Sequence, residues 1–257
     1  MHFPDFFLQD IQLADPSWHL VLHQGLEAVY QQHPDYLSAL ANSHFFPDSH
    51  RLFAAFSIPL HKVNYVLVGE GPYPRVESAT GYCFMDGAVD EIWSRDVSAG
   101  LSKAVNRATS LRNFVKMLLI DDQKIKLEQT SSATIVPIVQ ELRSDPDHYV
   151  QTMEQLKTNF LRQGFLMLNA SLVFRADVSP TVDARAWLPF LQVVFYALAQ
   201  QKTRPALILW GKIADKLAQI SIVNEFESFK SEHPYNLSFI TNSTMQNLFS
   251  SFNLLRK

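Results

Sequence analysis

Residues 63–74 read Val-Asn-Tyr-Val-Leu-Val-Gly-Glu-Gly-Pro-Tyr-Pro. The first six of them are mostly apolar, β-branched or aromatic, which is typical of a buried strand. Gly69 bounds this run, and the glycine and proline residues that follow predict a tight loop. The stretch therefore predicts a strand that presents a loop at one edge of a sheet.

Further strands and helices alternate along the rest of the chain. Residues 165–168 and 206–210 are apolar runs that end at Asn169 and Gly211, and residues 227–232 form a weaker strand candidate. Gly164 is well placed to end the helix before the second strand, and Ser243 and Gln246 have the spacing of a capping box. Helical spacing of apolar residues occurs near residues 17–32, 111–119, 147–162, 187–198, 212–220 and 243–252.

This alternation predicts an α/β fold. Strands separated by helices favour a parallel sheet, since a parallel crossover needs a dozen or more residues and usually contains a helix. We expect a three-layer αβα arrangement around a central, mainly parallel four-stranded sheet. No linker or repeat marks a boundary, so residues 1–257 are predicted to form one domain, with residues 1–60 as its helical N-terminal part.

The composition carries no global signal for nucleic acid. The 257 residues have a net charge of −3 and a pI near 6.3, so a nucleic-acid partner would need a local basic patch. The single cysteine, Cys83, cannot form an internal disulfide, which is compatible with a reducing cytoplasm. No apolar run reaches membrane-spanning length, and no phosphate-loop or zinc-ligand spacing occurs. We expect a cytoplasmic monomer without a metal or nucleotide cofactor.

Polar residues and turns follow the predicted strands. Ligands of open parallel sheets bind beyond the carboxyl ends of the strands, so Gly69 to Pro74, Asn169, Gly211 and His233 are predicted to converge on one edge. Taken singly, Asn169 at a strand end is more simply a turn or cap residue, and His233 before a proline is an ordinary loop residue. A Gly-x-Gly after a strand also occurs in dinucleotide-binding folds, but the third glycine would fall at Pro74.

Five segments, in order, resemble the uracil-DNA glycosylase superfamily, and most closely its family with the Gly-Gln-Asp-Pro-Tyr-His loop. They are residues 46–47 with 52–56, 66–74 with 81–84, 164–175, 207–214 and 233–238. This resemblance covers nearly the whole chain and implies the fold predicted above. It also implies a function in base-excision repair, in which a nucleotide is extruded from DNA and its base is held in a pocket.

The resemblance implies a role for individual residues. Asn169 would read the base, because a side-chain amide matches the adjacent donor and acceptor of uracil. Phe84 would stack on the base, Tyr73 would exclude a thymine methyl, and His233 would donate a hydrogen bond to O2 as negative charge develops there. The DNA contacts it implies are Leu237, as a wedge in the base stack, with Ser238 and Arg75.

The loop departs from the family at the catalytic position. Gly71 stands where the family has the aspartate that positions the attacking water, and Pro74 stands where it has a histidine. General-base catalysis of this kind is worth about 10²- to 10⁴-fold. Glu70, in place of a glutamine, and Asp86 are the nearest carboxylates that could hold a water. Tyr235 and Asn236 replace a Ser-Pro turn in the DNA-facing loop.

Two functions follow from this combination. One is an N-glycosidase that acts on uracil or a related damaged base in DNA. The other is a lapsed family member that binds DNA or a protein partner without cutting. Arg107, Arg112 and Lys116 read more simply as a solvated face, which leaves Arg75 as the better phosphate candidate by position.

Overall fold

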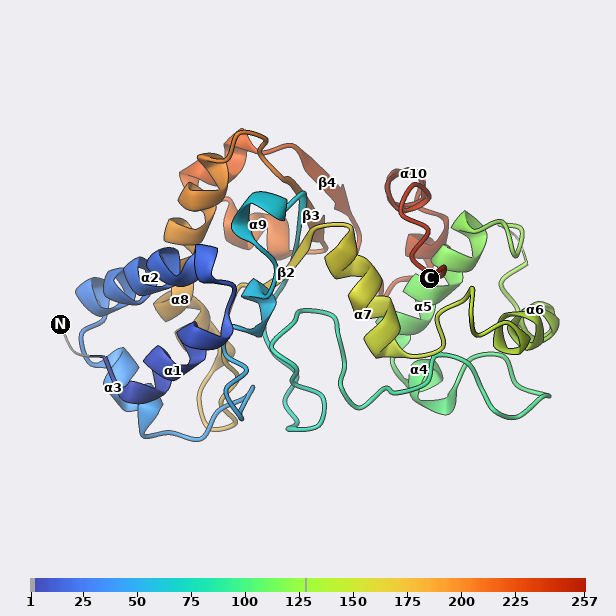
Figure 1. The fold of residues 1–257 in the computed structure, drawn as a ribbon, viewed down its shortest axis with the longest axis horizontal. Coiled ribbons are helices and arrows are strands. Elements are labelled where there is room, and N and C mark those ends of the chain that lie inside the picture. The colour runs from blue at the N-terminus through green and yellow to red at the C-terminus, as the bar shows by residue number, and fades with distance from the viewer. Residues whose placement is uncertain (1–2, 128) are drawn as a thin grey trace. The chain divides into compact units, whose positions relative to one another are not determined.

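The computed structural model describes residues 3–127 and 129–257 (Figure 1). They form two compact units. The first unit contains the residues up to Asp86 together with Gly164–Leu209 and Ile213–Ser228, and the second contains Gly87–Gln163, Trp210–Lys212 and Phe229–Lys257. The single domain expected over residues 1–257 stays a prediction.

A parallel sheet forms the centre of the fold. Within the described residues it has four strands in the order β2-β1-β3-β4, with bounds Tyr65–Gly69 (β1), Phe165–Asn169 (β2), Ala206–Trp210 (β3) and Ser228–Ser231 (β4). β1 pairs in parallel with β2 and β3, and its register places Gly69 beside Asn169. The α/β prediction is confirmed, and each predicted strand is found within two residues of its expected bounds.

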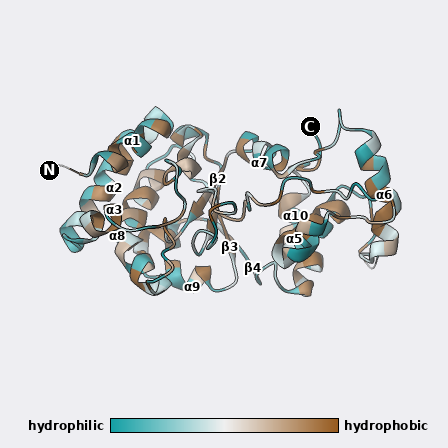
Figure 2. Ribbon diagram, turned by 90° about the horizontal axis from the view of Figure 1, so that it is seen from below, coloured by the Kyte–Doolittle hydropathy of each residue, from teal (hydrophilic) through white to brown (hydrophobic). Residues whose placement is uncertain are grey.

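Helices of the first unit cover one face of this sheet. Val66 and Val68 of β1 and Leu168 of β2 belong to one buried core with aromatic residues such as Trp187 and Phe190. These helices are amphipathic, as the mixed colours in Figure 2 show. Their bounds are Asp5–Leu13 (α1), His19–Gln32 (α2), Tyr36–Ala41 (α3), Pro180–Ala199 (α8) and Ile213–Leu217 (α9), with 3₁₀ turns at Pro16–Trp18 (η1), Ala54–Phe56 (η2), Leu60–Lys62 (η3) and Ser221–Glu225 (η4).

α2 and α8 pack closely because Gly25 leaves room for an aromatic ring. A Cβ atom at Gly25 would lie 2.5 Å from Cδ2 of Phe190. That ring stacks on Phe53 with centroids 5.7 Å apart. The described N-terminal residues up to Ala41 thus contribute three α-helices to the first unit. In the described part of the chain, no helix is both long enough and apolar enough to span a membrane.

A buried ion pair fixes the start of α8 within this unit. Asp183 is 1% exposed and accepts hydrogen bonds from Nε and Nη2 of Arg175 at 3.2 and 2.7 Å. The Tyr36 hydroxyl donates to the same carboxylate at 2.6 Å. Burial, followed by the hydrogen bond to Asp183, raises the pKa of Tyr36, so the phenol stays a donor. The Asp183 carboxylate therefore joins Tyr36 of α3 and Arg175 to the start of α8.

The second unit is built around an aromatic cluster. The Phe114 and Phe249 rings meet edge to face at 5.1 Å, and those of Trp210 and Phe239 meet at 5.4 Å. Phe160 stacks on Phe114. The elements of this unit are Lys103–Arg107 (α4), Thr109–Asp121 (α5), Ser132–Ser144 (α6), Met153–Arg162 (α7), Leu237–Thr241 (η5) and Ser243–Phe249 (α10).

Side-chain caps differ from the prediction at two helix starts. α7 begins at Met153 instead of near residue 147, because Thr152 forms a capping box with Gln155. The box predicted for Ser243 and Gln246 is wrong: Asn242 caps α10 by accepting from the Met245 N–H. The predicted stop at Gly164 is confirmed, since this residue has φ +81° and a Cβ atom there would lie 2.4 Å from the Lys62 carbonyl oxygen.

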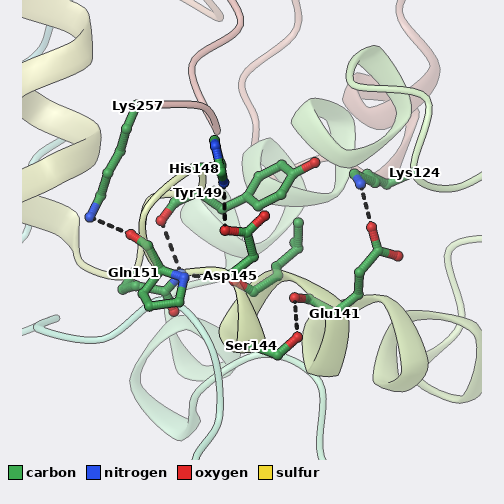
Figure 3. A network of polar contacts seen from close by, with 10 residues as sticks. Lys124, Glu141, Ser144, Asp145, His148, Tyr149, Gln151 and Lys257 are labelled. Carbon is green, nitrogen blue, oxygen red and sulfur yellow. Dashed lines mark hydrogen bonds and ion pairs between the residues drawn. The ribbon is translucent and has the colours of Figure 1, made fainter.

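A polar network ties the C-terminal residues to the loop before α7 (Figure 3). The Lys257 ammonium donates to the Pro146 carbonyl at 2.6 Å, and its backbone N–H donates to the His148 carbonyl at 2.9 Å. The imidazole of His148 is hydrogen-bonded to Asp145, and this partner raises the pKa of His148. Lys124 pairs with Glu141 at 2.6 Å in the same network.

A half-buried acid at the end of α5, Asp121, should make the stability of this unit depend on pH. Burial raises the pKa of Asp121 to about 7, and its Oδ2 has no hydrogen-bond partner among the described residues. The folded state then binds more protons than the unfolded state between about pH 4 and 7, so stability falls as pH rises through this window. Asp121→Asn should reduce the dependence of stability on pH in this window. Its melting temperature should be higher than that of the parent at pH 8 and little changed at pH 4.

The neighbouring acid provides a matched control for this prediction. The Asp122 carboxylate accepts from Nε of Arg256 at 2.6 Å. Asp122→Asn should therefore lower the melting temperature at pH 8, opposite in sign to Asp121→Asn. If the melting temperature changes equally with pH between pH 4 and 8 in the parent chain and in Asp121→Asn, the raised pKa of Asp121 is contradicted.

Candidate functional site

The amide predicted to read the base lies at the end of β2. Asn169 is 4% exposed and sits beside Gly69 in the parallel register. A Cβ atom on Gly69 would lie 2.8 Å from Asn169 Oδ1 and 2.8 Å from the Cβ of Cys83. Gly69 therefore provides the space in which the amide stands. Cys83 is buried as expected, and its thiol donates to the Leu67 carbonyl at 3.1 Å.

Gly69→Ala should distort this part of the site. The added methyl group must displace the Asn169 amide or the Cys83 side chain, and overpacking of this kind costs about 1–3 kcal/mol. Gly71→Ala is a matched control, because a Cβ atom there meets Ser171 at an ordinary 3.6 Å. Stability against urea and affinity for uracil-containing DNA should both be lower in Gly69→Ala than in the parent chain. In Gly71→Ala both should stay close to the parent values. Equal behaviour of the two variants would refute the close packing.

Gly71 lies on the loop after β1 in a conformation open to other residues. It is exposed and, unlike Gly81, Gly164 and Gly211, is not among the glycines with positive φ. A side chain at position 71 would therefore meet neither a backbone penalty nor a clash. The structure thus leaves room for a Cβ atom at residue 71, and the catalytic role of this position stays a prediction.

The carboxylate next to this position is engaged by a lysine. Glu70 accepts from Nζ of Lys216 at 2.8 Å, and both side chains are about half exposed. A cavity of about 470 Å³ in the first unit is lined by Glu70, Gly71 and Ser171, together with residues of α8 and α9 such as Arg185 and Lys216. Glu70 is thus directed to the wall of this cavity by its ion pair. Its role in holding a water stays a prediction.

Tyr73 and Phe84, the predicted walls of the base pocket, lie together. The Tyr73 hydroxyl donates to the Phe84 carbonyl at 3.5 Å. Burial, followed by the charge of Asp86, raises the pKa of Tyr73, which keeps the phenol neutral. Phe84 has φ +65°, a left-handed conformation that is uncommon for a non-glycine residue and recurs at functional sites.

Arg75, the predicted phosphate contact, faces its own loop. Its guanidinium donates to the Ser78 hydroxyl at 2.9 Å and lies 3.8 Å from both Glu77 and Asp86. The side chain is 57% exposed, so its charge stays accessible to a phosphate. Asp86 is nearly buried beside it.

His233 is exposed on the loop after β4, in the second unit. Its Nδ1 accepts a hydrogen bond from the Tyr235 N–H at 3.1 Å. An acceptor at Nδ1 places the proton of the neutral imidazole on Nε2, where it can be donated. Gly211 makes room for this residue, since its own Cβ atom would lie 3.1 Å from the Cβ of His233. The convergence of Asn169 and His233 on one base stays a prediction.

The predicted wedge follows on the same loop. Leu237 is 70% exposed at the start of η5. Ser238 is also exposed, and its hydroxyl lowers the pKa of Glu232, which accepts from Asn242 as well. An exposed leucine at this place is available to enter a base stack, as the resemblance implies.

No family model matches the chain. Of the proteins similar to it, a uracil-DNA glycosylase of Phocaeicola vulgatus is 27% identical over 194 residues, covering 75% of this chain and 70% of the relative. The crystal structure of the wild-type UNG from Nitratifractor salsuginis is 35% identical, with a TM-score of 0.88 and full coverage of both chains. The chain belongs to the uracil-DNA glycosylase superfamily. The mimivirus uracil-DNA glycosylase, 19% identical over 91% of this chain and 76% of its own with a TM-score of 0.56, shares the fold.

Two features of this superfamily member escaped prediction from sequence. Asn113 of α5 is fully buried and donates from Nδ2 to the carbonyl oxygens of Pro234, Tyr235 and Asn236, at 2.8, 3.3 and 3.4 Å. Lys216 engages Glu70 from a helix far along the chain. The sequence signal for the Asn113 contacts is a single polar residue on an otherwise apolar helical face.

Proposed function

We propose that this chain extrudes uracil or a related damaged base from DNA, binds it and hydrolyses its N-glycosidic bond. The observation that carries the proposal is the buried amide of Asn169, for which Gly69 leaves space at the carboxyl edge of the sheet. A neutral amide in an enclosed position distinguishes uracil from cytosine, because its donor and acceptor match only one of the two pairing edges. Phe84 and Tyr73 then bound the base from the same unit.

In the proposed step, water adds to C1′ of the sugar as the bond from C1′ to N1 of uracil breaks. The bonding electron pair leaves with the base, and the charge spreads to O2. The Nε2–H of His233 donates to this oxygen, since its Nδ1 is occupied by the Tyr235 N–H. The proton lost by the water passes to solvent or to the Glu70 carboxylate. Because Gly71 supplies no base, the reaction is expected to be slow.

An assay on oligonucleotides tests this proposal. The purified chain is incubated with single-stranded and duplex DNA containing one uracil, and abasic sites are then cleaved with alkali. The parent chain should cleave above a buffer control, and Asn169→Asp, which loses the amide donor, should not. A parent that cleaves none of several uracil or damaged-base substrates would reject the activity.

The second candidate function is binding of DNA or a protein partner without cleavage. It is favoured by Gly71 and Pro74 together, and by the ion pair that holds Glu70 on Lys216. Tight binding of uracil-containing DNA with no release of base would support it, and release at a rate that depends on Asn169 would eliminate it.

A further inference from the structure

The loop between β4 and η5 presents two large apolar side chains to solvent. Tyr235 is 67% exposed and Leu237 is 70% exposed, and both belong to the second unit. Leu237 corresponds to the wedge discussed above, whereas Tyr235 has no role in the proposed reaction beyond its backbone N–H.

The backbone around Tyr235 is anchored on both sides. The buried Asn113 amide donates to the carbonyls of residues 234 to 236, as described above. The Asn236 N–H donates to the His233 carbonyl at 2.9 Å, and Pro234 is buried. An aromatic ring on a fixed backbone has two side-chain torsions left to order, so little entropy is lost when a ligand covers it.

The size of the apolar surface indicates what covers this ring. Asn236 and Ser238, which flank Leu237 in the sequence, are exposed and polar, so this loop offers two large apolar side chains among polar neighbours. A stable protein interface needs about 800 Å² on each partner with a contiguous apolar centre, which this loop does not offer. One aromatic ring matches the π-face of one nucleobase, and such stacking tolerates any base.

We propose that Tyr235 is a stacking platform for the nucleobase that neighbours the extruded nucleotide in the DNA strand. This inference rests on the proposed function and extends it to the flanking DNA. The ring lies two residues from His233, the group assigned to the departing base, so a base stacked on it belongs to the same stretch of strand. Tyr235 acts as a binding residue and takes no part in bond cleavage.

Binding of labelled single-stranded DNA with one central uracil tests the proposal by fluorescence anisotropy. Tyr235→Ala should weaken binding about 5- to 150-fold, the range expected for one lost base stack. Tyr235→Phe should bind like the parent, as should Tyr196→Ala, which removes a 51% exposed tyrosine from α8. Stacking releases no counterions, so the slope of log affinity against log salt concentration should be the same for Tyr235→Ala and the parent.

A base-specific readout sharpens the test. With 2-aminopurine next to the uracil, binding to the parent should quench its fluorescence, and binding to Tyr235→Ala should not. Parent-like affinity and quenching in Tyr235→Ala, or equal losses in Tyr235→Phe, would overturn the stacking role. Either result would leave the proposed function standing as long as the parent binds DNA with uracil more tightly than DNA without it. Equal affinity of the parent for both DNAs would reject the proposed function itself.

Discussion

A Gly71→Asp variant should release uracil from DNA about 10²- to 10⁴-fold faster than the parent chain. The expectation follows from the local structure of the loop after β1. Residue 71 is exposed, lacks the positive φ that would penalise a side chain, and would place a Cβ atom 3.6 Å from Ser171, an ordinary contact. The first atom of an added side chain is therefore accommodated without rebuilding the loop, and the aspartate would supply the general base that residue 71 lacks in the proposed reaction.

Gly71→Asn is the matched control for this variant. It has the same shape and backbone preferences as aspartate but cannot accept a proton from water. Uracil release should stay at the parent rate in Gly71→Asn, and melting temperatures should be similar in all three proteins. If Gly71→Asp is no faster than Gly71→Asn, the missing aspartate is not what limits the rate.

The second large effect concerns stability and the ion pair at the start of α8. Asp183→Ala should destabilise the chain by about 3–5 kcal/mol, because it leaves the guanidinium of Arg175 largely buried without a counter-charge. An arginine side chain stays protonated at neutral pH even without a partner, so Arg175 cannot escape the penalty by losing its proton. Urea unfolding should show a lower midpoint with an unchanged m-value.

Two further variants separate the charge from the hydrogen bonds. Tyr36→Phe removes one donor to the carboxylate and should cost only about 0.5–1.5 kcal/mol. Replacing Arg175 and Asp183 together by leucine should recover most of the loss, since no unpaired charge is left. A double variant as unstable as Asp183→Ala would show that the damage comes from lost packing instead of from charge.

The sheet was predictable because β1, β2 and β3 are short apolar runs closed by glycine or asparagine, whereas β4, Ser-Phe-Lys-Ser, gave a weaker signal. Short apolar runs of this kind predict buried parallel strands, as at residues 66–69 and 206–210. Helix ends were less predictable, since the caps at Thr152 and Asn242 depend on single polar side chains that compete with equally plausible neighbours.

For the candidate site, the sequence supplied residue types and the resemblance supplied their roles. The space that Gly69 leaves for Asn169 depends on strand register, which no local pattern contains. The contacts of Asn113 and Lys216 join segments about a hundred residues or more apart, and a polar residue on a helix is by default assigned to solvent. Long-range polar contacts of this kind had to come from the structure.

The open surroundings of Gly71 also bear on how this lineage can change. The glycine codons GGU and GGC become aspartate codons by a single base substitution, and this backbone would accept the new residue without compensating changes elsewhere. An acid could thus be gained here, or lost again, by one point mutation in a gene whose product stays folded throughout. If an aspartate at residue 71 restores the general base, as we propose, activity can be gained or lost in this lineage through that one position.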